Sequence, residues 1–139
     1  MTLKEFIKAT NQVDAPDFYG IDKSTFPCLR PHAICSDGFI MSIQASAAHY
    51  CWPRENFLDE YEEYEVLPIT KEWGFESLKK LAKTKKQKDA LKWFMDMHDA
   101  PDISVPHNIL ETFLNLHGGI KEIRNMSEFM RMFLGNEHN

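Results

Sequence analysis

The fold is decided by the segment 33–44, which reads AICSDGFIMSIQ. Asp37-Gly38 stands between two apolar runs and is a strong hairpin signal, because these residue types tolerate the positive φ of a type I′ turn. After the turn, apolar residues recur at every second position, as in a strand with one buried face: Phe39, Met41 and Ile43. The segment therefore predicts a β-hairpin with a two-residue turn.

Two further strands are expected after the hairpin. His49–Trp52 reads as a short strand that Pro53 stops, and Tyr64–Leu67 reads as another that ends at Pro68. The connections are too short for parallel crossovers, so the strands should pair antiparallel. The expected sheet is small and antiparallel, with about three to four strands within residues 33–68.

Helices are expected on both sides of this sheet. Thr2 and Glu5 form a capping box for a short N-terminal helix over residues 3–10. After a proline-containing loop over residues 11–32 and the sheet, the apolar period changes to that of helices. We expect one over residues 73–82, one after Thr84, one that starts at 104–106 and stops at Gly118, and a last one after Ser127. The prediction is an α+β fold in one domain, 1–139, with the C-terminal helices packed on the sheet.

Length, charge and cysteine content narrow the class of protein. The chain has 139 residues, a formal net charge of −5 and three cysteines. Because the net charge is negative, we do not expect the protein to bind nucleic acid directly. The N-terminus does not read as a signal peptide, and no apolar run approaches the ~18 residues that span a bilayer. We therefore expect a cytoplasmic protein with free thiols and no membrane association.

The cysteines and two histidines form the main candidate for metal chemistry. Thiolate and imidazole at short spacings are zinc ligands, and such a set is present in Cys28, His32, Cys35, His49 and Cys51. Their spacing is not that of the usual paired zinc motifs, and buried cysteines often act as small apolar side chains. The alternatives are therefore a zinc site, a nucleophilic Cys51 with His49 or His32 as base, or thiols of the core.

An acidic and aromatic segment follows the second expected strand. Such a carboxylate run is most often a solvated face, but carboxylates beside tyrosines also suit a surface that binds a basic protein. The partner-binding candidates are Asp59, Glu60, Tyr61, Glu62, Glu63 and Tyr64. A lysine stretch over residues 83–92 reads as a solvated helix face, and together the acidic and basic zones leave self-association open.

Catalytic motifs do not appear in the chain. We find no phosphate-binding glycine loop, no His-Glu-x-x-His and no nucleophile elbow, so the chain is more readily a binding protein than an enzyme. No cofactor other than zinc is suggested.

The order of several short motifs resembles a known group of proteins. These motifs lie in 34–46, 49–54 and 64–66, and then in Val105-Pro106 and 117–120. In this order they resemble a group of small uncharacterised proteins encoded by bacteriophages and prophages. The segment 55–63 is more acidic than the group suggests, and 71–99 looks inserted or replaced.

The resemblance implies a context and carries over no catalytic residue. It implies a phage-type accessory protein, made in a bacterial host, that binds a host protein or complex and inhibits a defence system such as CRISPR-Cas. The alternatives are a small zinc-binding module or metal-dependent enzyme, and a structural or assembly component of a phage.

Overall fold

The hairpin at 33–44 is present in the computed structural model, which describes residues 1–11, 30–97 and 104–124. Strand β1 (His32–Cys35) pairs antiparallel with β2 (Ile40–Gln44). The turn between them differs from the predicted type I′. The amide of Gly38 donates to the carbonyl of Cys35 at 2.9 Å, and the amide of Cys35 donates to the carbonyl of Phe39 at 2.8 Å. These two bonds enclose a three-residue loop.

The side chain of Asp37 explains the longer turn. Its Oδ1 accepts the amide proton of Phe39 at 3.0 Å, a local bond that aspartate makes in turns. Among the described residues, positive φ outside glycine occurs at Phe57 alone, so Asp37 does not adopt it. Gly38 does, with φ of 93°. A type I turn followed by a left-handed glycine is the usual three-residue hairpin, and the two-residue type I′ prediction was wrong.

The sheet has five strands in the order β4-β3-β2-β1-β5, and all neighbours are antiparallel. Strand β3 (Glu63–Pro68) lies beside β2, as expected. The edges are β4 (Ser104–Pro106) and β5 (Ile120–Arg124), both from outside 33–68. The predicted α+β class and antiparallel sheet are confirmed, with slightly more strands than expected.

Two local predictions were wrong for identifiable reasons. Residues 49–52 do not form a strand, because the amide of Cys51 donates to the carbonyl of His49 at 2.9 Å in a tight turn, and Trp52 makes only an isolated bridge to Glu63. Ser104–Pro106 was expected to start a helix but is an edge strand, where Val105 pairs with Tyr64. Proline lacks an amide proton and is tolerated at a sheet edge, so Pro106 fits this position.

Four helices are described. They are α1 (Leu3–Ala9), α2 (Phe75–Leu81), α3 (Lys85–Met97) and α4 (His107–Leu116). The capping box of α1 is confirmed, since the amide of Glu5 donates to Thr2 Oγ1 and the amide of Thr2 donates to Glu5 Oε1. Residues 12–29 and the helix expected after Ser127 lie outside the described residues.

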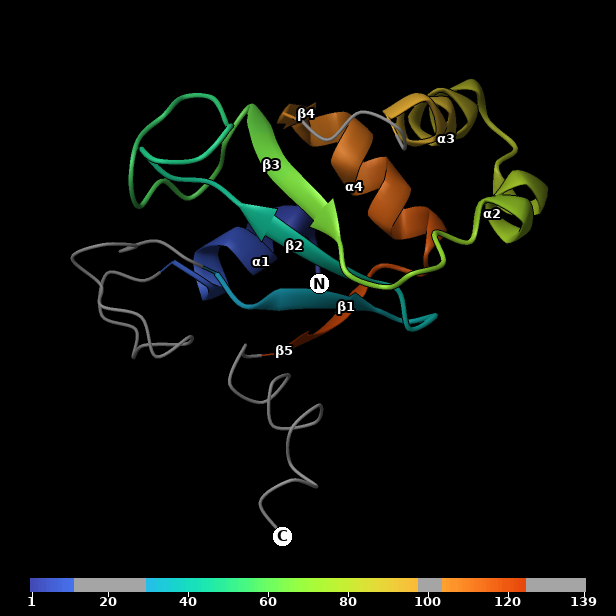
Figure 1. Ribbon diagram of the computed structural model, residues 1–139, viewed down its shortest axis with the longest axis horizontal. Coiled ribbons are helices and arrows are strands. Elements are labelled where there is room, and N and C mark those ends of the chain that lie inside the picture. Colours follow the sequence, from blue (N-terminus) through green and yellow to red (C-terminus); the bar gives the residue numbers. More distant parts are fainter. Residues whose placement is uncertain (12–29, 98–103, 125–139) are drawn as a thin grey trace, which may run out of the picture.

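Helix α4 links the sheet to α3, as Figure 1 shows. The ring of Phe113 on α4 stacks on Phe94 of α3 at 3.8 Å and meets Phe39 edge-on at 5.8 Å. All three rings are buried. Aromatic contacts of this kind add to the area that they bury, so they hold α4 in place between the two layers.

The two ends of α4 lie beside different parts of the sheet. His107 is its first residue and follows β4 directly, and His117 is its C-cap next to the β1–β2 turn. Gly118 ends the helix as predicted, with φ of 89°. None of the helices over residues 1–11, 30–97 and 104–124 has the length and apolar character needed to cross a membrane.

Candidate functional site: an acidic cleft at the start of α4

The acidic segment lies in the connection between β2 and β3, residues 45–62. Four of its carboxylate side chains are exposed: Glu55, Asp59, Glu60 and Glu62. Glu63 and Glu65 are half-buried on β3. Tyr61 and Tyr64, by contrast, are 2% and 0% exposed. The connection therefore presents its carboxylates to solvent, while Tyr61 and, on β3, Tyr64 place their rings in the core.

The buried tyrosines hold the connection in one conformation. The hydroxyl of Tyr61 donates to the carbonyl of Glu55 at 2.5 Å and accepts the amide proton of Leu58 at 3.3 Å. The hydroxyl of Tyr64 accepts the amide proton of Tyr61 at 3.1 Å. Because each ring fixes backbone groups several residues away, the exposed carboxylates start from a preorganised loop.

Aromatic contact area on this connection comes from residues that the sequence analysis did not select. Tyr50, Trp52 and Phe57 are 53%, 56% and 39% exposed. The guanidinium of Arg54 lies 5.2 Å from the ring centre of Tyr50, a cation–π contact. Large exposed aromatic side chains are typical of binding surfaces. The sequence held no signal for this exposure, because Tyr50 and Trp52 stand in a segment that reads as a strand.

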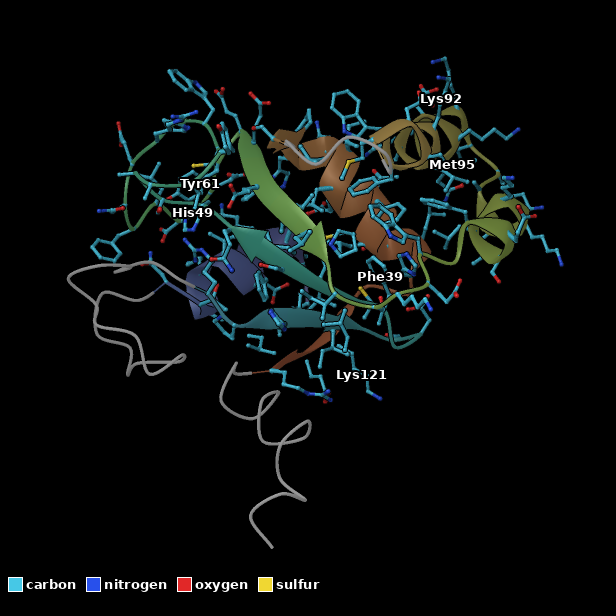
Figure 2. All side chains as sticks on the ribbon, viewed as in Figure 1. Phe39, His49, Tyr61, Lys92, Met95 and Lys121 are labelled. Carbon is cyan, nitrogen blue, oxygen red and sulfur yellow. The ribbon has the colours of Figure 1, made fainter. Side chains whose placement is uncertain are left out.

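A cleft of about 550 Å³ opens between this connection and the start of α4. Its walls combine apolar Pro53 and Leu58 with the carboxylates of Glu60 and Glu62, and His107 and Asn108 line the helix side. In Figure 2 Tyr61, another lining residue, lies in this part of the molecule, on the far side from Phe39. We call this feature the acidic cleft.

His107 connects the acidic cleft to the core. Its Nδ1 lies 2.7 Å from the hydroxyl of Tyr64, and its Nε2 lies 3.7 Å from Glu60 Oε1 and 3.5 Å from Glu111 Oε2. Carboxylates only accept hydrogen bonds, so we assign the ring proton to Nε2 and the donor role at Nδ1 to the phenol. Burial raises the pKa of Tyr64, which keeps that phenol protonated.

The acidic cleft suits a long basic side chain. Two carboxylates can pair with an ammonium or guanidinium group, while apolar walls accommodate its aliphatic stem. Glu60, which lines the cleft, and Glu111, which lies beside His107 outside the lining, keep about half and a third of their side-chain surface exposed. Such carboxylates remain hydrated in the free protein, so pairing with a cation does not require burying an isolated charge.

The cysteine and histidine set is only partly described. Cys28 lies outside the described residues. Cys35 and Cys51 are free, buried thiols. Burial, with a smaller effect from Asp37, raises the pKa of Cys35 to about 12, and burial also raises the pKa of Cys51. Burial lowers the pKa of His32. A buried, protonated thiol is a poor nucleophile and behaves as a core side chain.

Ser46 stands between His49 and Cys51. His49 Nδ1 lies 2.6 Å from the hydroxyl of Ser46, and the thiol of Cys51 donates to the carbonyl of Ser46 at 3.1 Å. The hydroxyl of Ser46, itself buried, also accepts the amide proton of Ala48 at 3.0 Å. The thiol and the imidazole thus bond to different atoms of Ser46 and not to each other, and these local bonds hold the start of the connection.

The metal prediction has no counterpart in the part of the chain that the structure describes. Across residues 1–11, 30–97 and 104–124, no group of three or more His, Cys, Asp or Glu side chains is placed to hold a metal ion. The complete five-residue set stays a prediction, because Cys28 is part of it.

No family model, curated protein or solved structure matches the chain.

Proposed function

We propose that this protein acts by non-catalytic binding, and that it docks a basic surface of another protein on the acidic cleft and the exposed aromatic residues beside it. One observation carries the proposal. Glu60 and Glu62 line a cleft with apolar walls, on a connection that also exposes Trp52 and Phe57. Interfaces combine rigid aromatic anchors with charges that steer the partner, and this connection offers both.

The identity of the partner rests on the resemblance to phage and prophage proteins. In that context the partner is a host protein or complex of a bacterial defence system, such as a CRISPR-Cas effector. Effectors of this class hold nucleic acid in positively charged channels. A preorganised acidic surface with aromatic contacts is the electrostatic complement of such a channel, which supports this choice of target.

The experiment uses a charge-reversal pair with a matched control. Glu60→Lys with Glu62→Lys changes the acidic cleft, and Glu76→Lys with Asp89→Lys makes the same change of net charge on α2 and α3. Each variant is added to a purified RNA-guided defence nuclease, and binding and target cleavage are measured. We expect the wild type and the α2–α3 control to bind and inhibit, and the cleft variant to bind at least about tenfold more weakly.

Two outcomes would overturn the proposal. If both double variants lose binding equally, net charge and not the acidic cleft is responsible. If the wild type neither binds nor inhibits any of the defence nucleases tested, this class of partner is wrong. Salt dependence gives a further check, because an interaction driven by exposed charges should weaken as ionic strength rises.

A further inference from the structure

A second cavity, of about 400 Å³, lies at the other end of α4. Its walls come from the β1–β2 turn, the loop that follows β3 and the C-cap of α4. Its lining includes Asp37, Phe39, Lys71, Glu72, Gly74 and His117. Phe39 marks this region in Figure 2, far from Tyr61 and His49. The cavity is therefore separate from the acidic cleft.

The carboxylate of Asp37 is fixed at the mouth of this cavity. Its Oδ2 lies 2.6 Å from His117 Nδ1, and its Oδ1 accepts the amide proton of Phe39 at 3.0 Å. The Asp37 side chain nevertheless keeps 46% of its surface exposed. Two bonds therefore set the direction of a carboxylate that solvent can still reach.

His117 presents an acceptor that has no partner. Its side chain is 2% exposed, and its ring stacks on Phe39 at 4.0 Å with an angle of 4° between the planes. Because its Nδ1 proton is donated to Asp37, the neutral ring carries its lone pair on Nε2. Nε2 is buried and has no hydrogen-bond partner within the described residues. Burial lowers the pKa of His117, although Asp37 raises it in part, so the ring is neutral near pH 7.

Gly74 lies against the edge of the His117 ring and contributes only backbone atoms to the cavity wall there. A Cβ built on Gly74 would lie 3.5 Å from His117 Cε1, the carbon between the two ring nitrogens. Gly74 belongs to residues 69–74, which form neither helix nor strand. The loop is held by a bond from the Ile69 amide to Ile40 and by the ring of Trp73 beside Phe94, so a shift that exposes the ring is confined to the part between them and to Gly74.

We propose that this cavity binds a small organic cation that carries N–H donors, namely an amine, an amidine or a guanidine. One N–H donates to Nε2 of His117, and the positive charge faces the carboxylates of Asp37 and Glu72. These two carboxylates outnumber the single cation in the wall, Lys71. A buried acceptor left without a donor is costly, so the ligand supplies the bond that the protein lacks.

Access to Nε2 requires a small movement. The atom is enclosed in the structure, and Gly74 of the loop 69–74 lies against the neighbouring ring carbon, Cε1. The ligand therefore displaces this loop at Gly74 as it enters, and binding should perturb the loop together with the ring. A cation that is only attracted to surface carboxylates would not perturb the ring of His117 and the loop at Gly74 together.

The test uses the full chain, benzamidine as the cationic probe and benzamide as its uncharged relative. Nitrogen-edited NMR follows His117 Nε2 and the amides of Gly38 and Gly74 during titration. We expect saturable shifts at all three positions with benzamidine, and binding at least about tenfold weaker with benzamide. Asp37→Asn removes the charge and keeps one acceptor oxygen, which can serve either His117 Nδ1 or the Phe39 amide but not both, and it should weaken benzamidine binding by about tenfold.

The controls separate a built site from general charge attraction. Asp96→Asn makes the same chemical change on the exposed side of α3 and should leave benzamidine affinity unchanged. Glu72→Gln gives a smaller loss than Asp37→Asn and serves as the second variant if the latter fails to fold. The proposal is overturned if wild-type His117 shows no saturable shift up to about 10 mM benzamidine. Equal binding of benzamide overturns it as well, as does an equal effect of Asp96→Asn.

Discussion

The two ends of α4 each place a histidine against a different partner. At the N-terminus, His107 Nδ1 meets the phenol of Tyr64, and at the C-cap, His117 Nδ1 meets the carboxylate of Asp37. The phenol can donate, so it leaves the proton of His107 on Nε2, toward Glu60 and Glu111. The carboxylate can only accept, so it draws the proton of His117 to Nδ1 and leaves Nε2 as a lone pair.

This difference teaches that the partner of one ring nitrogen decides what the other nitrogen offers. The start of α4 offers an N–H among carboxylates in a partly exposed cleft. The end of α4 offers a buried acceptor beside a fixed carboxylate. The first arrangement fits a basic protein surface held at the rim, and the second fits a small ligand that is enclosed.

The largest expected effect comes from removing the side chain that supports the C-terminal end. Phe113 touches Phe94, Phe39 and the ring of His117. Phe113→Ala should lower the free energy of unfolding by about 3–5 kcal/mol, because it leaves a cavity in the core. Urea denaturation measures this. Phe57→Ala, at a partly exposed ring, is the matched control and should cost about 0.5 kcal/mol or less. Equal losses would contradict the assigned role of Phe113.

A pair of glycine substitutions isolates the contact between the β1–β2 turn and the end of α4. Gly38 and Gly118 have φ of 93° and 89°, so alanine is strained at both. A Cβ on Gly38 would meet nothing within 4 Å, whereas one on Gly118 would lie 2.9 Å from Ser36 Cβ. Gly38→Ala should cost about 1–2 kcal/mol and Gly118→Ala about 2–4 kcal/mol in urea denaturation. Identical costs would show that Ser36 moves away freely.

The N-terminal end is tested by removing one hydroxyl. Tyr64→Phe deletes the group that accepts from the buried Tyr61 amide and bonds to the partly buried His107, and it leaves both partners unsatisfied. We expect a loss of about 1–3 kcal/mol in the free energy of unfolding. Tyr50→Phe removes an exposed hydroxyl and should change the free energy of unfolding by less than about 0.5 kcal/mol. If the two substitutions cost the same, Tyr64 does not organise the acidic cleft.

Local patterns in the sequence were sufficient for much of this fold. The hairpin at Asp37-Gly38, though not its predicted turn type, the Thr2 and Glu5 capping box and the helix stop at Gly118 depend on neighbouring residues and are confirmed. Strands β4 and β5 were missed because edge strands form by pairing with distant segments. Val105 has no local signal that selects Tyr64 as its partner.

The candidate sites were less predictable than the fold. The carboxylates of Glu60 and Glu62 were selected from their composition alone, but their cleft needs His107, which lies far away in the sequence. The sequence pattern also did not predict which aromatic side chains are buried. Tyr61 and Tyr64 alternate with acidic residues like surface aromatics, yet both rings point into the core, while Trp52 is exposed. Tertiary packing decides which member of an aromatic cluster faces solvent.

The smallest effect expected concerns pH. Burial lowers the pKa of His117 below its ordinary value of 6.5. Between the two pKa values the ring is therefore protonated in the unfolded chain and neutral in the folded chain. The stability that the neutral ring confers is complete above about pH 6.5 and is lost as the pH falls toward the folded pKa, by at most about 1.4 kcal/mol per pH unit. In Asp37→Asn the raising effect of the carboxylate is gone, so the pKa of His117 should fall further and extend that loss to lower pH. Ring titration by NMR checks the direction, and a pKa that rises in Asp37→Asn would contradict the assigned bond between these two side chains.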